Sequence, residues 1–210
     1  MNATPDERAP RPADPTVSRP RLYWLVGLTM AALFLAMVFV WWHSGGNFVP
    51  GIGGPFKLED GTGKTVTDRD FRGKYMLVYF GYTFCPDVCP TTLNEVAEAM
   101  DRLGPKAEKI QPIFITVDPD RDTPPVVQQF ASAFTPRLIG LTGTSDQIAT
   151  VANEYRVYYA KHRTGPGPND YSMDHSSILY LMGTDGAFLA PIRTDRSGAE
   201  IADEIAKLVR

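Results

Sequence analysis

The hydrophobic pattern divides the chain into one long apolar run near the N-terminus and a later stretch of shorter strand-like and helix-like segments. Residues 22–42 read LYWLVGLTMAALFLAMVFVWW and contain no charged residue. About 20 apolar residues suffice for a helix to cross the ~30 Å hydrocarbon core of a bilayer. Aromatic residues stand at both ends of the run, as is typical of membrane-spanning helices. The pattern predicts one transmembrane helix over 22–42 rather than a cleaved signal peptide, whose apolar region would be shorter.

The residues around this run predict its orientation. Four arginines lie within residues 1–21, and the first charged residue after the run is Lys57. Positive charge stays on the cytoplasmic side, so the rest of the chain is expected outside the cytoplasm. Residues 1–21 also hold five prolines and predict a disordered cytoplasmic tail, and the glycine-rich residues 43–55 predict a flexible tether. Without an amphipathic targeting peptide, we expect a single-pass protein of the bacterial inner membrane whose C-terminal domain lies in the periplasm.

Residues 56–210 predict a single α/β domain. The continuous apolar runs YMLVYF (75–80) and IQPIFITV (110–117) are typical of buried strands. Apolar residues at helical spacing predict helices over 91–103, 123–134, 145–155 and 198–209. Shorter strands are expected at 56–58, 138–141, 157–161, 177–182 and 187–190, and residues 164–174 are expected to be a Gly/Pro loop. This order of elements predicts a thioredoxin-like fold with a mixed sheet.

The only two cysteines of the chain, Cys85 and Cys89, carry the most informative chemistry. Residues four apart share one face of a helix, and their Cα atoms are then roughly 6 Å apart, within the range of a disulfide bond. A disulfide persists outside the cytoplasm. The residues alone leave two uses open, because the pair can chelate a soft metal or cycle between dithiol and disulfide. A net charge of −3 gives no reason to expect a nucleic-acid partner.

A histidine is expected to join the two thiols at one edge of the sheet. Ligands of open α/β sheets bind beyond the carboxyl ends of the strands, where the cysteine loop and Asp118 both lie. His175 precedes strand 177–182, and it reaches the same edge if that strand is antiparallel. Thiolates and imidazole suit copper, whereas structural zinc sites and iron–sulfur clusters usually take four protein ligands. The predicted copper ligands are therefore Cys85, Cys89 and His175.

Two carboxylates are candidates for supporting this site. Asp118 or Asp174 is expected to accept the second ring N–H of His175, as metal-bound histidines usually require. Cys89 is expected just before a helix, where the helix dipole lowers a thiol pKa. His162 stands between Lys161 and Arg163 and is interpreted as a solvated residue rather than a ligand.

Three motifs together resemble the Sco (SenC) family of membrane-anchored copper chaperones. They are GYTFCPDVCPTTL, VDPDRDTP and DHSS before an apolar strand, and the resemblance covers about residues 50–210. It implies a thioredoxin-like fold, a membrane anchor, and copper bound by Cys85, Cys89 and His175. It also implies a carrier rather than an enzyme, one that supplies the dinuclear copper centre of cytochrome c oxidase subunit II. Other periplasmic copper chaperones are further candidate partners.

A second function uses the same sulfurs. In a thiol–disulfide oxidoreductase, Cys85 and Cys89 would reduce the copper-ligand cysteines of the oxidase subunit, and His175 would tune the thiols. A sensor that signals through the membrane helix ranks last, because residues 1–21 contain no recognisable output module.

Overall fold

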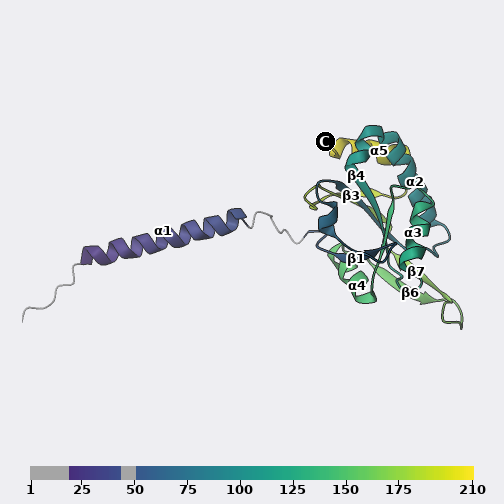
Figure 1. Cartoon of the computed structure of the whole chain (residues 1–210), viewed down its shortest axis with the longest axis horizontal. Helices are drawn as coiled ribbons and strands as arrows, with labels where there is room; N and C mark the ends of the chain where they lie inside the picture. The colour runs from purple at the N-terminus through teal and green to yellow at the C-terminus, as the bar shows by residue number, and fades with distance from the viewer. Residues whose placement is uncertain (1–18, 44–50) are drawn as a thin grey trace, which may run out of the picture. The chain divides into compact units, whose positions relative to one another are not determined.

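The structure, a computed structural model, describes residues 19–43 and 51–210, which belong to two separate units (Figure 1). The N-terminal unit contains helix α1, Arg19–His43, so the helix begins before the expected residue 22 and extends past residue 42. Side chains of α1 are described only for residues 23–38. Within the described residues, no helix combines the length and the apolar character that a membrane span requires. The predicted tail up to residue 18 and residues 44–50 of the predicted tether lie outside the described residues.

The second unit is built on a mixed seven-stranded sheet with the strand order β2-β1-β5-β4-β3-β8-β9. The strands are β1 Lys57–Asp60, β2 Thr65–Thr67, β3 Tyr75–Gly81, β4 Ile110–Thr116, β5 Ile139–Thr142, β8 Ile178–Met182 and β9 Phe188–Arg193. The predicted mixed sheet is therefore confirmed. Sequence-based boundaries differ from these by a few residues, as expected where a strand runs into a turn.

Strand β3 lies between β4 and β8 in the sheet, and the cysteine loop follows its carboxyl end. It runs parallel to β4, so the cysteine loop and Asp118 follow the same edge of the sheet, and it runs antiparallel to β8, which is the condition for His175 to reach that edge. Every residue of β3 after Tyr75 is buried. A strand buried on both faces reads as a continuous apolar run, which explains the YMLVYF pattern.

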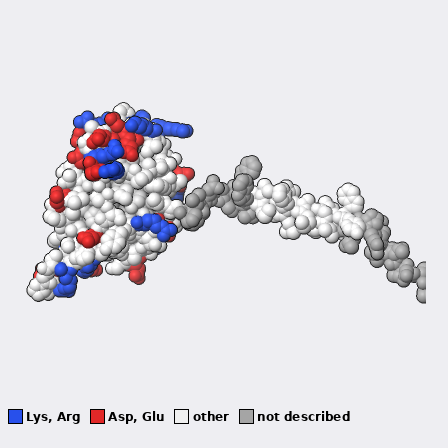
Figure 2. Space-filling view, turned by 180° about the vertical axis from the view of Figure 1, so that it is seen from behind, with Lys and Arg blue, Asp and Glu red and all other residues white. Residues whose placement is uncertain are grey.

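Helices cover both faces of the sheet (Figure 1). They are α2 Val88–Leu103, α3 Pro124–Ser132, α4 Ser145–Glu154 and α5 Gly198–Leu208, with 3₁₀ turns at Asp68–Phe71 and Gly104–Lys109. On one face Phe114 of β4 packs between Tyr79 and Phe130 of α3. On the other face Phe80 packs against Tyr155, directly after α4. Figure 2 shows acidic and basic side chains gathered together at the end of the domain where α5 lies.

A separate two-stranded sheet stands beside the main one. It is the antiparallel hairpin of β6, Tyr159–Arg163, and β7, Tyr171–His175. The expectation of a loop through residue 174 was therefore wrong, and the loop is confined to residues 164–170. Tyr171 and Met173 are buried while Ser172 and Asp174 are not, which is the alternation of a half-buried strand. We refer to β6, β7 and their connection, residues 159–175, as the histidine hairpin.

The last residues of the predicted tether are attached to the domain. The Gly53 N–H donates a hydrogen bond of 2.7 Å to the Glu154 carbonyl, and Ile52 packs against the core. Gly53 has φ +90°, and a Cβ there would lie 2.4 Å from Cε of Met182. Glycine is required at this close contact because a side chain would meet both a strained backbone and a steric clash.

Candidate metal and thiol site

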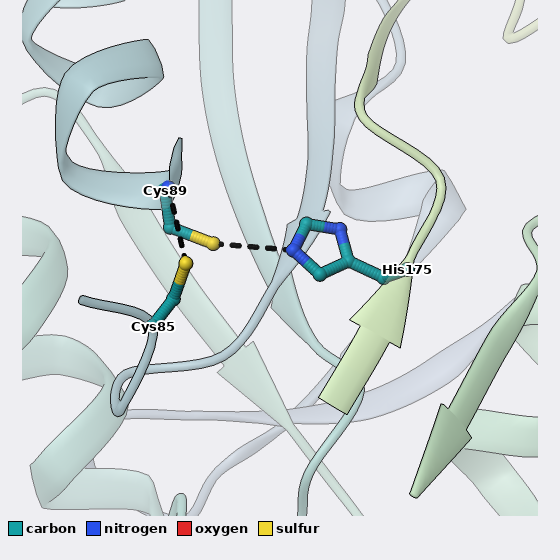
Figure 3. Close-up of side chains that lie close together, drawn as sticks. All are labelled: Cys85, Cys89 and His175. Atoms are coloured by element: carbon teal, nitrogen blue, oxygen red, sulfur yellow. Dashed lines mark hydrogen bonds between the residues drawn. The ribbon is translucent and has the colours of Figure 1, made fainter. Parts of the chain in front are cut away.

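The cysteine loop connects the end of β3 at Gly81 to the start of α2 at Val88. Cys85 lies in the loop and Cys89 is the second residue of the helix, which begins earlier than the predicted residue 91. Cys89 was expected just before the helix and instead lies in its first turn, while Cys85 stays in the loop as expected. The Cys89 backbone N–H donates to the Cys85 sulfur at 3.3 Å (Figure 3). An unpaired N–H at the start of a helix is thus satisfied by a thiol.

His175 reaches the cysteines from the end of β7. Its Nε2 lies 3.3 Å from the sulfur of Cys89, and Figure 3 shows the ring directed at the two thiols. One ligand atom from each of Cys85, Cys89 and His175 can be chosen so that all lie within 4.8 Å of one another. The rings of Tyr79 and Tyr82 meet the imidazole edge-on, each with centroids 6.0 Å away. The structure therefore brings together the three predicted ligands, and their binding of a metal stays a prediction.

The two cysteines of the site differ in their exposure to solvent. A cavity of about 340 Å³ is lined by residues that include Cys85, Met173 and His175. Cys85 is half-buried, whereas Cys89 is fully buried. A reagent or partner entering the cavity therefore meets the sulfur of Cys85 first.

The two thiols differ strongly in acidity. A hydrogen bond from the Cys89 side chain lowers the pKa of Cys85 to about 5, and the backbone N–H groups of Cys89 and Asp87 add to the effect. The same hydrogen bond, together with burial, raises the pKa of Cys89. The hydrogen-bonded pair therefore releases its first proton readily and its second with difficulty. The reduced pair is thus expected to hold one negative charge at neutral pH.

Asp118 does not contact the imidazole, contrary to one of the two predicted arrangements. Its carboxylate is buried, accepts a hydrogen bond of 2.8 Å from the Tyr171 hydroxyl, and forms an ion pair with Arg121. Both of its oxygens are therefore committed to groups other than His175.

Asp174 also fails to orient the imidazole. Neighbouring residues of a strand point to opposite faces, so the side chains of Asp174 and His175 diverge. The Asp174 carboxylate is 63% exposed and lies 2.9 Å from Nε2 of His162, which is itself exposed on β6. The imidazole Nδ1 of His175 instead lies 3.2 Å from the Ser176 carbonyl. A backbone carbonyl that accepts this N–H leaves Nε2 free to bind a metal.

Sequence reasoning missed two residues near the site. The Tyr79 hydroxyl donates to the Cys89 sulfur at 3.8 Å, although Tyr79 had been interpreted only as part of a buried strand. Arg121 lies within the VDPDRDTP motif, and its contacts with Phe84 and Tyr171 join segments far apart in the sequence. The VDPDRDTP motif indicated that this segment matters, but no local sequence pattern indicated which side chains Arg121 would contact.

The fold is that of a thioredoxin-like domain. The two thiols and the imidazole at the strand ends are suited to soft-metal or thiol chemistry. A family model described as SCO1/SenC matches residues 45–210. The chain belongs to the SCO1/SenC family.

Individual relatives agree with this assignment. Protein SenC of Rhodobacter capsulatus is 45% identical over 154 residues, which cover 73% of this chain and 69% of that protein. The human mitochondrial SCO1 homolog is 41% identical over 167 residues, which cover 77% of this chain and 54% of that protein. The structure of Bradyrhizobium japonicum ScoI with copper bound is 46% identical, covers 75% of this chain and 99% of that one, and has a TM-score of 0.68.

A plant relative extends the comparison. The crystal structure of Arabidopsis thaliana ScoI with copper bound is 40% identical, covers 75% of this chain and 97% of that one, and has a TM-score of 0.69. Against the mitochondrial SCO proteins of human, mouse, yeast, cattle and Arabidopsis, the chain spans only about half of their length, from 46% to 58%.

Proposed function

We propose that this chain is a copper carrier that binds copper through Cys85, Cys89 and His175 and supplies the dinuclear centre of cytochrome c oxidase subunit II. The observation that carries the proposal is the meeting of the two sulfurs and the ring nitrogen within 4.8 Å. Two thiolates and an imidazole are a donor set that copper favours. The copper-bound structures of relatives at 46% and 40% identity support the choice of metal.

The residues of the site account for both binding and release. Cys85 holds its negative charge at neutral pH because its pKa is lowered to about 5 by hydrogen bonding, mainly from Cys89. Binding then requires the loss of only one further proton, from Cys89. Three protein ligands leave room for a ligand supplied by an acceptor, and Cys85 faces the open cavity. An acceptor thiolate can therefore replace the Cys85 sulfur first, with the buried Cys89 released later.

The test of binding uses the soluble domain, residues 50–210, loaded anaerobically with Cu(I). We expect one copper per chain with two sulfur neighbours and one nitrogen neighbour in X-ray absorption. His175→Ala should remove the nitrogen neighbour and weaken binding at least tenfold, because losing a ligand should cost no less than the roughly 10- to 100-fold typical of losing an outer-shell partner. His162→Ala is the control for loss of an imidazole, because His162 pairs with Asp174 but does not itself line the cavity. Unchanged copper retention in His175→Ala would contradict the proposed ligand set.

The test of delivery mixes the copper-loaded domain with the reduced, metal-free soluble domain of cytochrome c oxidase subunit II. We expect copper to be found with the acceptor once the two proteins have been separated, and less of it when the donor is copper-loaded Cys85→Ser. Transfer that is no faster than from a small-molecule copper complex would count against a carrier role.

We also propose that residues 22–42 anchor the protein in the bacterial inner membrane and that the domain faces the periplasm. The uncharged apolar run and the four preceding arginines support this placement. Protease added to spheroplasts should degrade the domain, whereas it should spare the domain in intact cells. A domain that stays protected in spheroplasts would contradict the proposed topology.

A second function, thiol–disulfide exchange with the same acceptor, is favoured by the asymmetry of the pair. The accessible Cys85 thiolate would attack an acceptor disulfide and form a mixed disulfide, releasing one acceptor thiolate. The buried Cys89 sulfur would then attack Cys85, forming the Cys85–Cys89 disulfide and releasing the second acceptor thiol. The test uses the metal-free, reduced domain and an acceptor whose copper-ligand cysteines are oxidised. If the domain reduces these cysteines so that the acceptor then binds free copper, and if His175→Ala does so equally well, thiol–disulfide exchange explains the assembly of the copper centre better than copper delivery does.

A further inference from the structure

The segment Asp118–Asp122 contacts both chain segments that contribute to the site. It follows the carboxyl end of β4 and lies between the cysteine loop and the histidine hairpin. Asp122 binds the cysteine loop, because its carboxylate accepts hydrogen bonds from the Thr83 N–H at 2.9 Å and the Thr83 hydroxyl at 2.5 Å. Asp122 is itself buried and accepts a third hydrogen bond from the Thr116 hydroxyl. The cysteine loop is therefore fixed to the main sheet by contacts independent of the hairpin.

The histidine hairpin depends on other residues of the same segment. Its two strands form a sheet of their own and are not part of the seven-stranded ladder. The Tyr171 hydroxyl donates to Asp118, and Nη1 of Arg121 donates to the Tyr171 carbonyl at 3.0 Å. Lys161 of β6 reaches Asp120 at 3.1 Å. The Tyr171 contacts fix both the side chain and the backbone at the first residue of β7.

Within the segment Asp118–Asp122, Arg121 is a side chain that touches both the cysteine loop and the histidine hairpin. The centre of its guanidinium lies 3.6 Å from the centroid of the Tyr171 ring and 4.6 Å from that of Phe84. The side chain is only 8% exposed, and it pairs with Asp118. Its Nη2 is buried with no hydrogen-bond partner among the residues that the structure describes. The ring of Tyr82 lies farther away, at 5.8 Å. A buried cation with one unpaired nitrogen depends on its ion pair and on these aromatic rings, so its position is closely constrained.

The rings of Phe84 and Tyr171 belong to chain segments that each carry a ligand candidate. Phe84 directly precedes Cys85 in the chain. Tyr171, Met173 and His175 stand at alternate positions of β7, so their side chains share one face of a short, rigid strand. Fixing Tyr171 at one end of β7 therefore fixes where His175 lies at the other end.

We propose that Arg121 is a positioning residue that holds the histidine hairpin against the cysteine loop and so keeps the imidazole of His175 within ligand distance of the two sulfurs. The proposal rests on the copper site described above for its functional consequence. Its structural part concerns the metal-free protein and stands independently of copper. The guanidinium matters through its flat shape and its fork of N–H groups, and charge alone does not replace these features.

Arg121→Lys is the test variant, because lysine keeps a positive charge beside the buried Asp118 but loses the flat stacking surface and the directed bond to the Tyr171 carbonyl. Arg72→Lys is the control for replacing an ion-paired arginine elsewhere in the domain. Arg72 is more exposed than Arg121, pairs at 2.7 Å with the buried Asp68, and does not line the cavity. A double variant, Arg121→Met with Asp118→Asn, removes both charges together and covers the case in which lysine is poorly accommodated.

In the metal-free domain, Arg121→Lys should increase amide hydrogen exchange in β7 at least tenfold while leaving β3 and β4 unchanged. Nuclear Overhauser contacts between the His175 ring and the rings of Tyr79 and Tyr82 should weaken. Arg72→Lys should show neither effect. Wild-type exchange and contacts in both Arg121 variants would overturn the proposal, whatever the protein does with copper.

With copper, Arg121→Lys should still bind one ion per chain through two sulfurs, but with at least tenfold lower affinity and fewer than one nitrogen neighbour. The decisive comparison places Arg121→Lys in the His175→Ala background. A residue that acts through the imidazole has no further effect once the imidazole is gone. If the loss of affinity persists in that background, Arg121 does not act through His175 and the proposal is wrong. If wild-type protein binds no copper, the proposed function fails, while the metal-free measurements still decide the role of Arg121.

Discussion

Cys85 is expected to react with iodoacetamide over a pH range in which ordinary cysteines are protonated and unreactive. Hydrogen bonding, chiefly from the Cys89 thiol, lowers the pKa of Cys85 from an ordinary 9.0 to about 5. A lowered pKa means that the reactive thiolate is present above about pH 5 and is lost as the pH falls through that value. At pH 7 roughly 99% of Cys85 is then thiolate, against roughly 1% for an ordinary cysteine.

The rate at pH 7 is nevertheless a poor test of this acidity. Nucleophilicity falls with pKa, and a Brønsted slope of about 0.4–0.5 over four units makes the thiolate roughly 40- to 100-fold less reactive. This loss nearly cancels the gain in thiolate fraction. The midpoint of the pH–rate profile separates the two cases, because it reports the pKa directly.

The assay measures alkylation of the metal-free, fully reduced domain between pH 4 and pH 10. Trypsin releases both cysteines in one peptide, residues 75–102, and fragment ions assign the label to Cys85 or Cys89. We expect Cys85 to be labelled with a midpoint near pH 5 and Cys89 to stay unlabelled. Cys89→Ala removes the thiol hydrogen bond but keeps the backbone N–H, so the midpoint should rise toward the ordinary value. A wild-type midpoint near pH 9, or one that Cys89→Ala leaves unchanged, would refute the reasoning.

Other substitutions test the packing behind the site. Gly81→Ala places a Cβ 2.8 Å from the Cys89 sulfur and should displace it. Copper affinity, measured by competition with a chelator, should then fall on the order of 10-fold. An unchanged affinity would show that the sulfur is free to move. Leu77→Ala empties a fully buried position of β3 and should cost about 2–5 kcal/mol in urea unfolding, with a cost below about 1 kcal/mol arguing against tight packing there. Ser197→Ala removes the side-chain acceptor for the Glu200 N–H at the start of α5 and should cost about 1 kcal/mol in the same assay without affecting copper.

The sequence predicted the parts of the fold that depend on burial over many residues. β3 and β4 were recognisable because a strand buried on both faces is continuously apolar. The start of α2 was predicted at residue 91, because the apolar residues at helical spacing begin only at Leu93. Proline fits the first turn of a helix, where its missing N–H needs no partner. The helix could therefore begin at Val88, before the proline.

The sequence predicted which residues meet at the candidate site more accurately than it predicted the contacts that hold them there. His175 was expected at the right edge of the sheet, but the alternation over only five residues of β7 was hidden beside a Gly/Pro-rich stretch. That alternation decides that Asp174 points away from His175. The contacts of Arg121 were beyond prediction, because Tyr171 and Phe84 approach it only when three separate segments have packed.

The two thiols and the imidazole lie far apart along the sequence, and this affects the chain while it is being synthesised. Cys89 and His175 are 86 residues apart, and closing a loop of that length costs about 4 kcal/mol of chain entropy. A ribosome-bound chain that ends before residue 175 carries both sulfurs without the ring that completes the set. Thiol labelling of chains stalled at increasing lengths should show Cys89 open to a reagent in the short chains and buried once the domain has folded, whereas Cys85, which lines the cavity, should react in both.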